Sequence, residues 1–246
     1  MSGTGPSVLV LVRHGESVGN VAAAQAERAG AKTIAVGTRD ADTPLTARGE
    51  EQARALGTWL GALPADEAPQ SVWCSPYVRA AQTAEAALDA AGLSVPVRYD
   101  ERLRDRELGI IDRLTRAGVA RRFPEEDTRR HLLGKMYYRP PGGESWADVA
   151  QRLRGVLGDL VRAEDGRRVL VVTHDATVML LRYVLEGLSE AQLMAEVRRH
   201  GVRNASVTRL LRHDDAWQLD AFDVVDHLEV LEAPVTTHPG TDPRGE

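Results

Sequence analysis

The sequence predicts an α/β fold: a three-layer sandwich with a mostly parallel central sheet flanked by helices. Short runs rich in valine and leucine alternate with segments of helical periodicity, which is typical of parallel strands joined by crossover helices. Two of these runs, 7–12 and 168–173, are apolar almost throughout. Strands that are buried on both faces of a covered sheet have this composition.

Six segments are predicted as strands, and the last of them alternates like a half-exposed edge strand: 7–12, 71–74, 95–99, 168–173, 205–211 and 216–222. Helices are expected between them over 46–63, 75–91, 145–163, 176–188 and 189–200. Ser75 before Pro76 predicts a helix start, and Ser145 with Asp148 resembles a capping box. Residues 21–42 are rich in alanine and then loop-like, and they give no clear pattern.

Length and composition favour one globular domain over 1–232, followed by a disordered tail over 233–246 that is rich in Pro, Gly and Thr. The chain has 246 residues, of which 43% are hydrophobic and 27% are charged. The net charge of -5 argues against a nucleic-acid partner, and no apolar run could cross a membrane. A single cysteine and the lack of a signal peptide favour a cytoplasmic location. The oligomeric state stays open.

Reactive residues follow several of the predicted strands. Arg13 and His14 come directly after the first strand, and His174 follows the fourth. Arg79 lies one helical turn beyond the second strand, and Asp105 lies in a charged run after the third. Because ligands bind beyond the carboxyl ends of strands in such sheets, we expect these side chains to share one site.

These residue types suit phosphoryl transfer without a metal or another cofactor. A neutral imidazole can act as a nucleophile, and arginines grip tetrahedral oxyanions. Two arginines and a second, protonated histidine would neutralise the transferring group, while a carboxylic acid could protonate the leaving oxygen. A metal held by the two histidines is the alternative, but flanking arginines would repel a cation.

The motif "LVRHGES" resembles the Arg-His-Gly motif of the histidine phosphatase superfamily, the phosphoglycerate mutase-like family. The resemblance extends from about Val8 to Leu211 and includes further pieces in order: Asn20, "DTPLTARGEEQA", "CSPYVRAAQTA", "PGGES" and "VVTH". Each piece falls where the family pattern expects it, at or near the end of a predicted strand.

The resemblance implies a role for each matching residue. His14 would be the phosphorylated nucleophile, and Arg13 and Arg79 would bind the phosphoryl oxygens with help from Asn20. His174 would donate a hydrogen bond to the phosphoryl group. The proton donor falls at Asp105, where the family usually has glutamate, with Glu107 as the alternative. Asp175 is a second departure, since the family commonly has glycine after this histidine.

Three functions remain open at this stage. A phosphatase acting on a small phosphorylated metabolite is favoured over a phosphoglycerate mutase-type transferase, because only 38 residues separate Asp105 from Glu144 and mutases carry a longer insertion there. A non-catalytic phosphoester-binding module is the third. The segment 110–141 is expected to act as a lid that offers side chains to the rest of the substrate: Arg121, Lys135, Tyr137 or Arg139.

Overall fold

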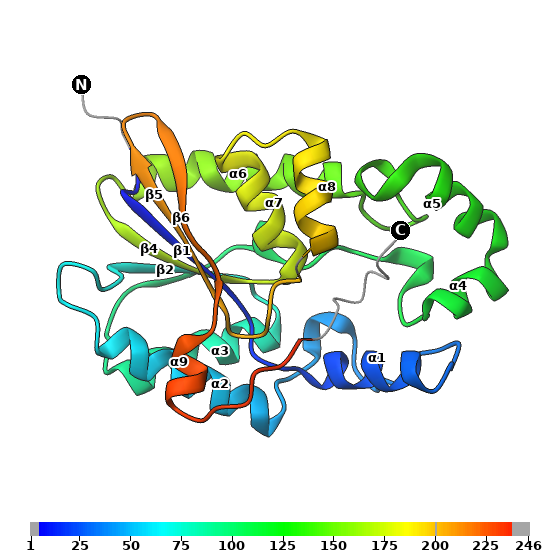
Figure 1. Cartoon of the computed structure of the whole chain (residues 1–246), viewed down its shortest axis with the longest axis horizontal. Coiled ribbons are helices and arrows are strands. Elements are labelled where there is room, and N and C mark those ends of the chain that lie inside the picture. The colour runs from blue at the N-terminus through cyan, green and yellow to red at the C-terminus, as the bar shows by residue number, and fades with distance from the viewer. Residues whose placement is uncertain (1–4, 200, 238–246) are drawn as a thin grey trace.

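A central six-stranded sheet organises the molecule, whose computed structural model describes residues 5–199 and 201–237. The strands lie in the order β3-β2-β4-β1-β5-β6 (Figure 1). Their bounds are β1 Val8–Arg13, β2 Ser71–Cys74, β3 Val97–Tyr99, β4 Arg168–Thr173, β5 Val207–His213 and β6 Ala216–Val224. The strands β1 to β4 run parallel, and β5 and β6 add an antiparallel edge. The predicted fold class is confirmed, including β6 as an edge strand.

Strand register brings the two histidines to one edge of the sheet. Arg13, the last residue of β1, pairs with Thr173, the last residue of β4. His14 and His174 therefore directly follow two neighbouring parallel strands, at the same edge of the sheet. The His14 amide continues the ladder by donating to the Thr173 carbonyl oxygen at 2.9 Å. Both histidines are thus placed by backbone pairing rather than by mobile loops.

Helices cover both faces of the sheet, because each face is apolar and must be buried against another layer. One core lies under α6 (Trp146–Ala163), α7 (Asp175–Leu185) and α8 (Glu190–Arg199). The other lies under α2 (Ala47–Gly61) and α3 (Val78–Ala91), with α9 (Asp226–Val230) packed against α2. Figure 1 shows these two helical layers on opposite sides of the strands.

The remaining helices lie together beyond the carboxyl ends of the parallel strands (Figure 1). They are α1 (Val18–Arg28), α4 (Arg116–Arg122) and α5 (Pro124–Tyr137), with short 3₁₀ turns η1 (Asp40–Asp42), η2 (Glu101–Leu103) and η3 (Gly109–Ile111). Among the described residues, no helix combines the length and the apolar composition that a bilayer crossing needs.

The start of α3 corrects the prediction for 75–91. The helix begins at Val78 with Tyr77 as its cap residue, two residues later than the predicted cap Ser75 and first helical residue Pro76. The reason is that the Ser75 hydroxyl contacts His174 Nε2 at 2.9 Å, and the Ser75 amide still pairs with β4 through the Val172 carbonyl. The capping box of Ser145 and Asp148 at α6 is present as predicted.

Part of the predicted disordered tail is ordered, so that prediction was wrong for residues 233–237. Thr236 is buried, and its hydroxyl donates to Asn204 Oδ1 at 3.1 Å. The Gln52 amide donates to Thr236 Oγ1 at 2.8 Å and to the Pro234 carbonyl. These bonds fix the segment despite its composition, since each satisfies a buried polar group. Residues 238–246 lie outside the described part of the chain.

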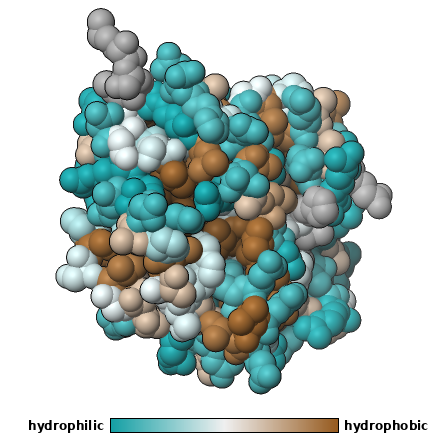
Figure 2. All heavy atoms as spheres, turned by 60° about the vertical axis from the view of Figure 1, so that its left-hand side comes forward, coloured by the Kyte–Doolittle hydropathy of each residue, from teal (hydrophilic) through white to brown (hydrophobic). Residues whose placement is uncertain are grey.

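The surface carries both polar side chains and apolar patches. Figure 2 shows hydrophilic side chains over much of one face, interrupted by several apolar areas. Val230 is 80% exposed, and with Trp59 and Leu231 it lines a surface cavity of about 410 Å³ between α2, α9 and the β5-β6 edge. None of the side chains that line this cavity belongs to the pocket around His14.

The contact between α2 and α3 predicts a sharp effect of one methyl group. A Cβ at Gly57 would lie 2.3 Å from the Ala87 carbonyl oxygen, so Gly57→Ala must push two helices apart. We expect a loss of about 1–3 kcal/mol in the free energy of unfolding, measured with urea. Gly158→Ala in α6 is the control, because its Cβ meets only the flexible end of Arg162 at 3.6 Å. That change should leave stability equal or raise it by about 0.5–1 kcal/mol. Equal effects of both substitutions would contradict the packing argument.

Candidate active site

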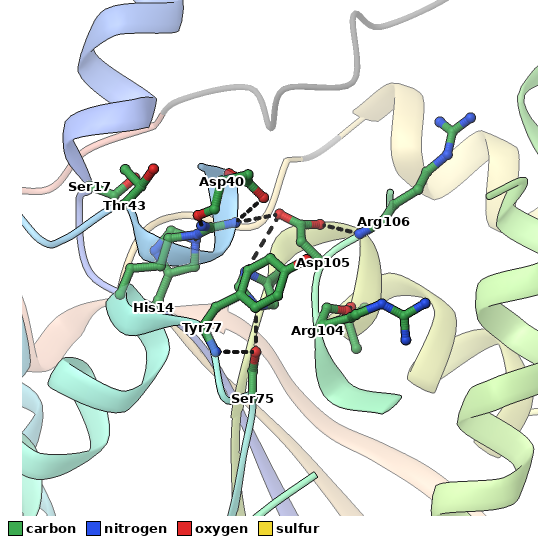
Figure 3. Close-up of polar contacts among 12 residues, drawn as sticks. His14, Ser17, Asp40, Thr43, Ser75, Tyr77, Arg104, Asp105 and Arg106 are labelled. Atoms are coloured by element: carbon green, nitrogen blue, oxygen red, sulfur yellow. Dashed lines mark hydrogen bonds and ion pairs between the residues drawn. The ribbon is translucent and has the colours of Figure 1, made fainter. Parts of the chain in front are cut away.

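The reactive residues predicted from the sequence gather in one pocket at the carboxyl ends of β1, β2 and β4. Five of them line it: Arg13, His14, Asn20, Arg79 and Asp105. His174 packs against His14 with ring centroids 5.1 Å apart. We call the pocket formed by these side chains the cradle. Figure 3 shows how side chains from β1, β2, η1 and the loop after η2 point toward one another here.

The hydrogen bonds of His14 define which ring nitrogen is reactive. Its Nδ1 donates to the Gly15 carbonyl oxygen at 2.7 Å, so the proton lies on Nδ1. Its Nε2 accepts from Arg79 Nε at 3.2 Å and therefore carries the lone pair. Burial, followed by the charge of Arg79 and the neighbouring His174, holds the pKa of His14 well below its ordinary value of 6.5. The ring is neutral, as a nucleophile must be.

Two nearly buried arginines flank this ring. Arg13 is 1% exposed and donates through Nη1 to the Val202 carbonyl oxygen. Arg79 is 3% exposed and donates to Asp40 Oδ2 at 3.1 Å and to Asp105 Oδ2 at 3.2 Å. Burial opposes the charge of Arg79, but the two carboxylates outweigh it and raise its pKa. Both guanidinium groups stay charged and suit an oxyanion.

His174 lies in a fully buried position beside Ser75 and Asp105. Its ring is completely buried, and Nε2 lies 2.9 Å from Ser75 Oγ. Nδ1 has no hydrogen-bond partner among the described residues and lies 3.5 Å from Asp105 Oδ2. Burial, Arg79 and Arg152 lower the pKa of His174 well below 6.5. These surroundings favour a neutral His174 ring when no phosphoryl group is bound, and a neutral ring still donates through one nitrogen. Protonation of His174 beside a bound phosphoryl group stays a prediction.

The geometry separates the two candidate acids. The Asp105 side chain is 21% exposed, lines the cradle and contacts both Arg79 and His174. The Glu107 side chain is 50% exposed, and its carboxylate accepts from the Tyr77 hydroxyl at 2.9 Å. Glu107 does not line the cradle. Asp105 is thus the carboxyl group placed to meet a leaving oxygen, although its role as donor stays a prediction.

Two further aspartates contribute charge to the cradle. Asp40, in η1, pairs with Arg79 and lines the pocket, and sequence reasoning missed it because 21–42 gave no pattern. Asp175 lines the pocket from the start of α7, and its Oδ1 accepts from the Val202 amide at 3.4 Å. Burial lowers the pKa of Arg13, and Asp175 is the strongest opposing charge. Burial also raises the pKa of Asp175 itself.

A buried amide network holds the backbone behind His14. Asn204 is completely buried, and its Nδ2 donates to the His14 carbonyl at 3.1 Å and to Asn20 Oδ1 at 3.2 Å. Asn20 Oδ1 also accepts from the Ser17 amide, in the capping box of α1. Asn20 therefore serves as a helix cap as well as a pocket residue. These contacts place Asn204 behind His14, at the base of the site.

Only one of the four expected lid side chains lines the cradle. Lys135 does so, and its ammonium lies 4.5 Å from the centroid of the Trp146 ring. Arg139 instead pairs with Asp148, Tyr137 is 57% exposed, and Arg121 is exposed on α4. Within the part of the chain that the structure describes, no group of three or more His, Cys, Asp or Glu side chains is arranged to hold a metal ion.

Comparisons with known proteins agree with the motifs. A family model of the histidine phosphatase superfamily (branch 1) matches residues 9–224. The chain is 36% identical over 201 residues to a 2,3-bisphosphoglycerate-dependent phosphoglycerate mutase of Methylobacterium radiotolerans, covering 79% of this chain and 86% of the mutase. It is 35% identical to a 6-phosphofructo-2-kinase/fructose-2,6-bisphosphatase of Caenorhabditis elegans, over 73% of this chain and 34% of that protein. A solved mycobacterial glucosyl-3-phosphoglycerate phosphatase is similar at a TM-score of 0.70 and 32% identity, covering 89% of this chain and 100% of the other.

The environment of His14 predicts its tautomer. Long-range nitrogen–proton NMR correlations should show that His14 is protonated on Nδ1 and unprotonated on Nε2. The same pattern should persist as the pH falls through 6.5. The reason is that burial and Arg79 both disfavour the imidazolium. A His14→Gln variant assigns the signals. Titration of the His14 ring with a midpoint near 6.5 would contradict the assignment.

Proposed function

Because the chain belongs to the histidine phosphatase superfamily, we propose that it is a metal-independent phosphatase that hydrolyses a small phosphomonoester through a phosphohistidine on His14. The observation that carries this proposal is the His14 ring, with Nδ1 bonded to Gly15 and the Nε2 lone pair beside Arg79. A phosphoryl group bound by Arg79 would lie against the nucleophilic nitrogen. The two arginines supply the positive charge that phosphoryl transfer requires.

The reaction then has two steps. In the first, His14 Nε2 forms a bond to phosphorus as the bond to the leaving oxygen breaks, and Asp105 gives that oxygen a proton. In the second, a water molecule loses a proton to the Asp105 carboxylate and attacks the phosphohistidine, which releases phosphate and restores His14. Asp105 returns to its protonated form, so protons and charges balance over the cycle.

A mutase is the second candidate, and one observation favours it: a mutase is among the curated relatives, at 36% identity. In a mutase, a hydroxyl group of a bound acid would take the phosphoryl group from His14 in place of water. The similar glucosyl-3-phosphoglycerate phosphatase structure, at 32% identity, supports hydrolysis instead. A non-catalytic module fits least, because the nucleophile, both arginines and a carboxyl group lie within one pocket.

Trapping the intermediate tests the nucleophile. Acid-labile label from a ³²P-phosphomonoester should appear on the protein after rapid quenching, and His14→Ala should lower it by about a thousandfold or more. His213→Ala is the matched control, because His213 is exposed and lies far along β5. Full labelling of the His14→Ala protein would overturn the assignment. In the same preparation, phosphoglycerate interconversion faster than phosphate release would favour the mutase.

Substitution of Asp105 and substitution of Glu107 should affect the kinetics differently. Asp105→Asn should slow phosphoenzyme formation by roughly 10²- to 10⁴-fold with an alkyl phosphate, whose leaving group needs a proton. The loss should shrink with p-nitrophenyl phosphate, because nitrophenolate leaves without one. Glu107→Gln should change either rate by less than about threefold, since Glu107 contacts Tyr77 outside the cradle. A large, leaving-group-dependent loss only in Glu107→Gln would transfer the role to Glu107.

A further inference from the structure

A second cavity adjoins the cradle. It has a volume of about 210 Å³ and lies between α5 and α8, with Arg116 of α4 at its wall. We call this cavity the chamber. Lys135 and Val197 line both the chamber and the cradle, so they form the boundary between the two. Figure 1 shows α4, α5 and α8 gathered at this end of the molecule.

The chamber is strongly basic. Four permanently charged cations line it, against the single carboxylate of Glu190: Arg116, Arg130, Lys135 and Arg198. Arg116 and Arg198 are exposed, whereas Arg130 is buried. The imidazole of His131 also lines the chamber. A concave surface lined by one sign of charge concentrates its field and attracts ligand groups of the opposite sign.

A break in α5 brings Lys135 to the boundary. Gly134 interrupts the helix with φ 70° and ψ 169°, a backbone conformation that glycine adopts without strain. Lys135 follows directly and extends over the Trp146 ring. Met136 and Met194 line the chamber beside it, so its walls can also contact an apolar linker.

The cradle side of the boundary carries an acidic side chain, Asp175, beside its cations. Asp175 lines the cradle next to His174, where a phosphoryl group would sit. A second anion close to the reacting phosphoryl group would meet the Asp175 carboxylate, whereas an anion beyond Lys135 would meet the cations of the chamber.

We propose that the chamber binds a second anionic group of the substrate, a carboxylate or a phosphate separated from the reacting phosphoryl group by a linker of several atoms. This inference rests on the proposed phosphohistidine chemistry and adds a substrate class to it. Lys135 marks the passage between the sites, Arg116 and Arg198 receive the remote anion, and Asp175 disfavours substrates whose two anions are adjacent.

The experiment measures kcat/KM for phosphorylated alcohols of graded length. One series carries a terminal carboxylate, from phosphoglycolate to 8-phosphooxyoctanoate; a second carries a terminal phosphate, and a third a neutral hydroxyl. We expect the charged series to exceed the neutral one by about tenfold at the longer lengths, and to fall below it at the shortest. The carboxylate and phosphate series together identify which anion the chamber prefers.

Two surface variants test the location of the effect. Arg198→Gln should reduce the preference for long charged substrates several-fold and leave kcat/KM for the neutral series unchanged. Arg199→Gln is the matched control, because Arg199 is 69% exposed, pairs with Glu196 and does not line the chamber. Asp175→Asn should raise the relative rate of the shortest charged substrates.

The outcomes separate this inference from the function on which it rests. Equal charged-to-neutral ratios at every length, or a preference that Arg198→Gln leaves intact, would overturn the chamber as an anion site. The His14 phosphoenzyme would still form from the neutral series in either case. Failure to form a phosphoenzyme from any substrate would refute the phosphatase itself.

Discussion

The site depends on the burial of two arginines beside two histidines. Arg13 and Arg79 are 1% and 3% exposed, and a buried charge is tolerated only when other groups compensate for it. Protonation of either ring would add a like charge in a low-dielectric environment, so His14 and His174 are both held neutral. Carboxylates supply the compensation from three separate elements: Asp40, Asp105 and Asp175. The neutral nucleophile is therefore a consequence of its burial, and then of the cations that would bind its substrate.

Rigid backbone contacts keep this arrangement in place. A Cβ at Gly15 would lie 2.5 Å from the Gly49 carbonyl oxygen, and one at Gly49 would lie 2.0 Å from the Glu16 carbonyl oxygen. The turn after β1 thus packs directly on the start of α2, at a distance that only glycine permits. Asn204 binds the His14 carbonyl from the other side. Because the Gly49 backbone and the Asn204 side chain hold the chain around His14, its lone pair keeps its direction without help from a mobile loop.

The sequence was informative wherever backbone pairing decides position. His14 and His174 follow buried strands, and strand register alone brings them to one edge, so their meeting was predictable. The position of Asp40 was not predictable, because it depends on a loop and on a contact with Arg79, a partner distant in sequence. Thr236 was missed for a similar reason: composition predicted disorder, but buried polar groups fix it. Ser75 looked like a helix cap because nothing local indicates that its hydroxyl meets His174.

The contacts of Asp105 suggest how a short acid could act in this cradle. In the structure its Oδ2 lies 3.2 Å from Arg79 Nη2. A phosphoryl group bound to Arg79 would compete for that guanidinium and would bring negative charge next to Asp105. Asp105 would thus lose an attractive partner and gain a repulsive neighbour. Substrate binding would then itself prepare the donor, and departure of the phosphoryl group to His14 would return Asp105 to the state that accepts a proton from water.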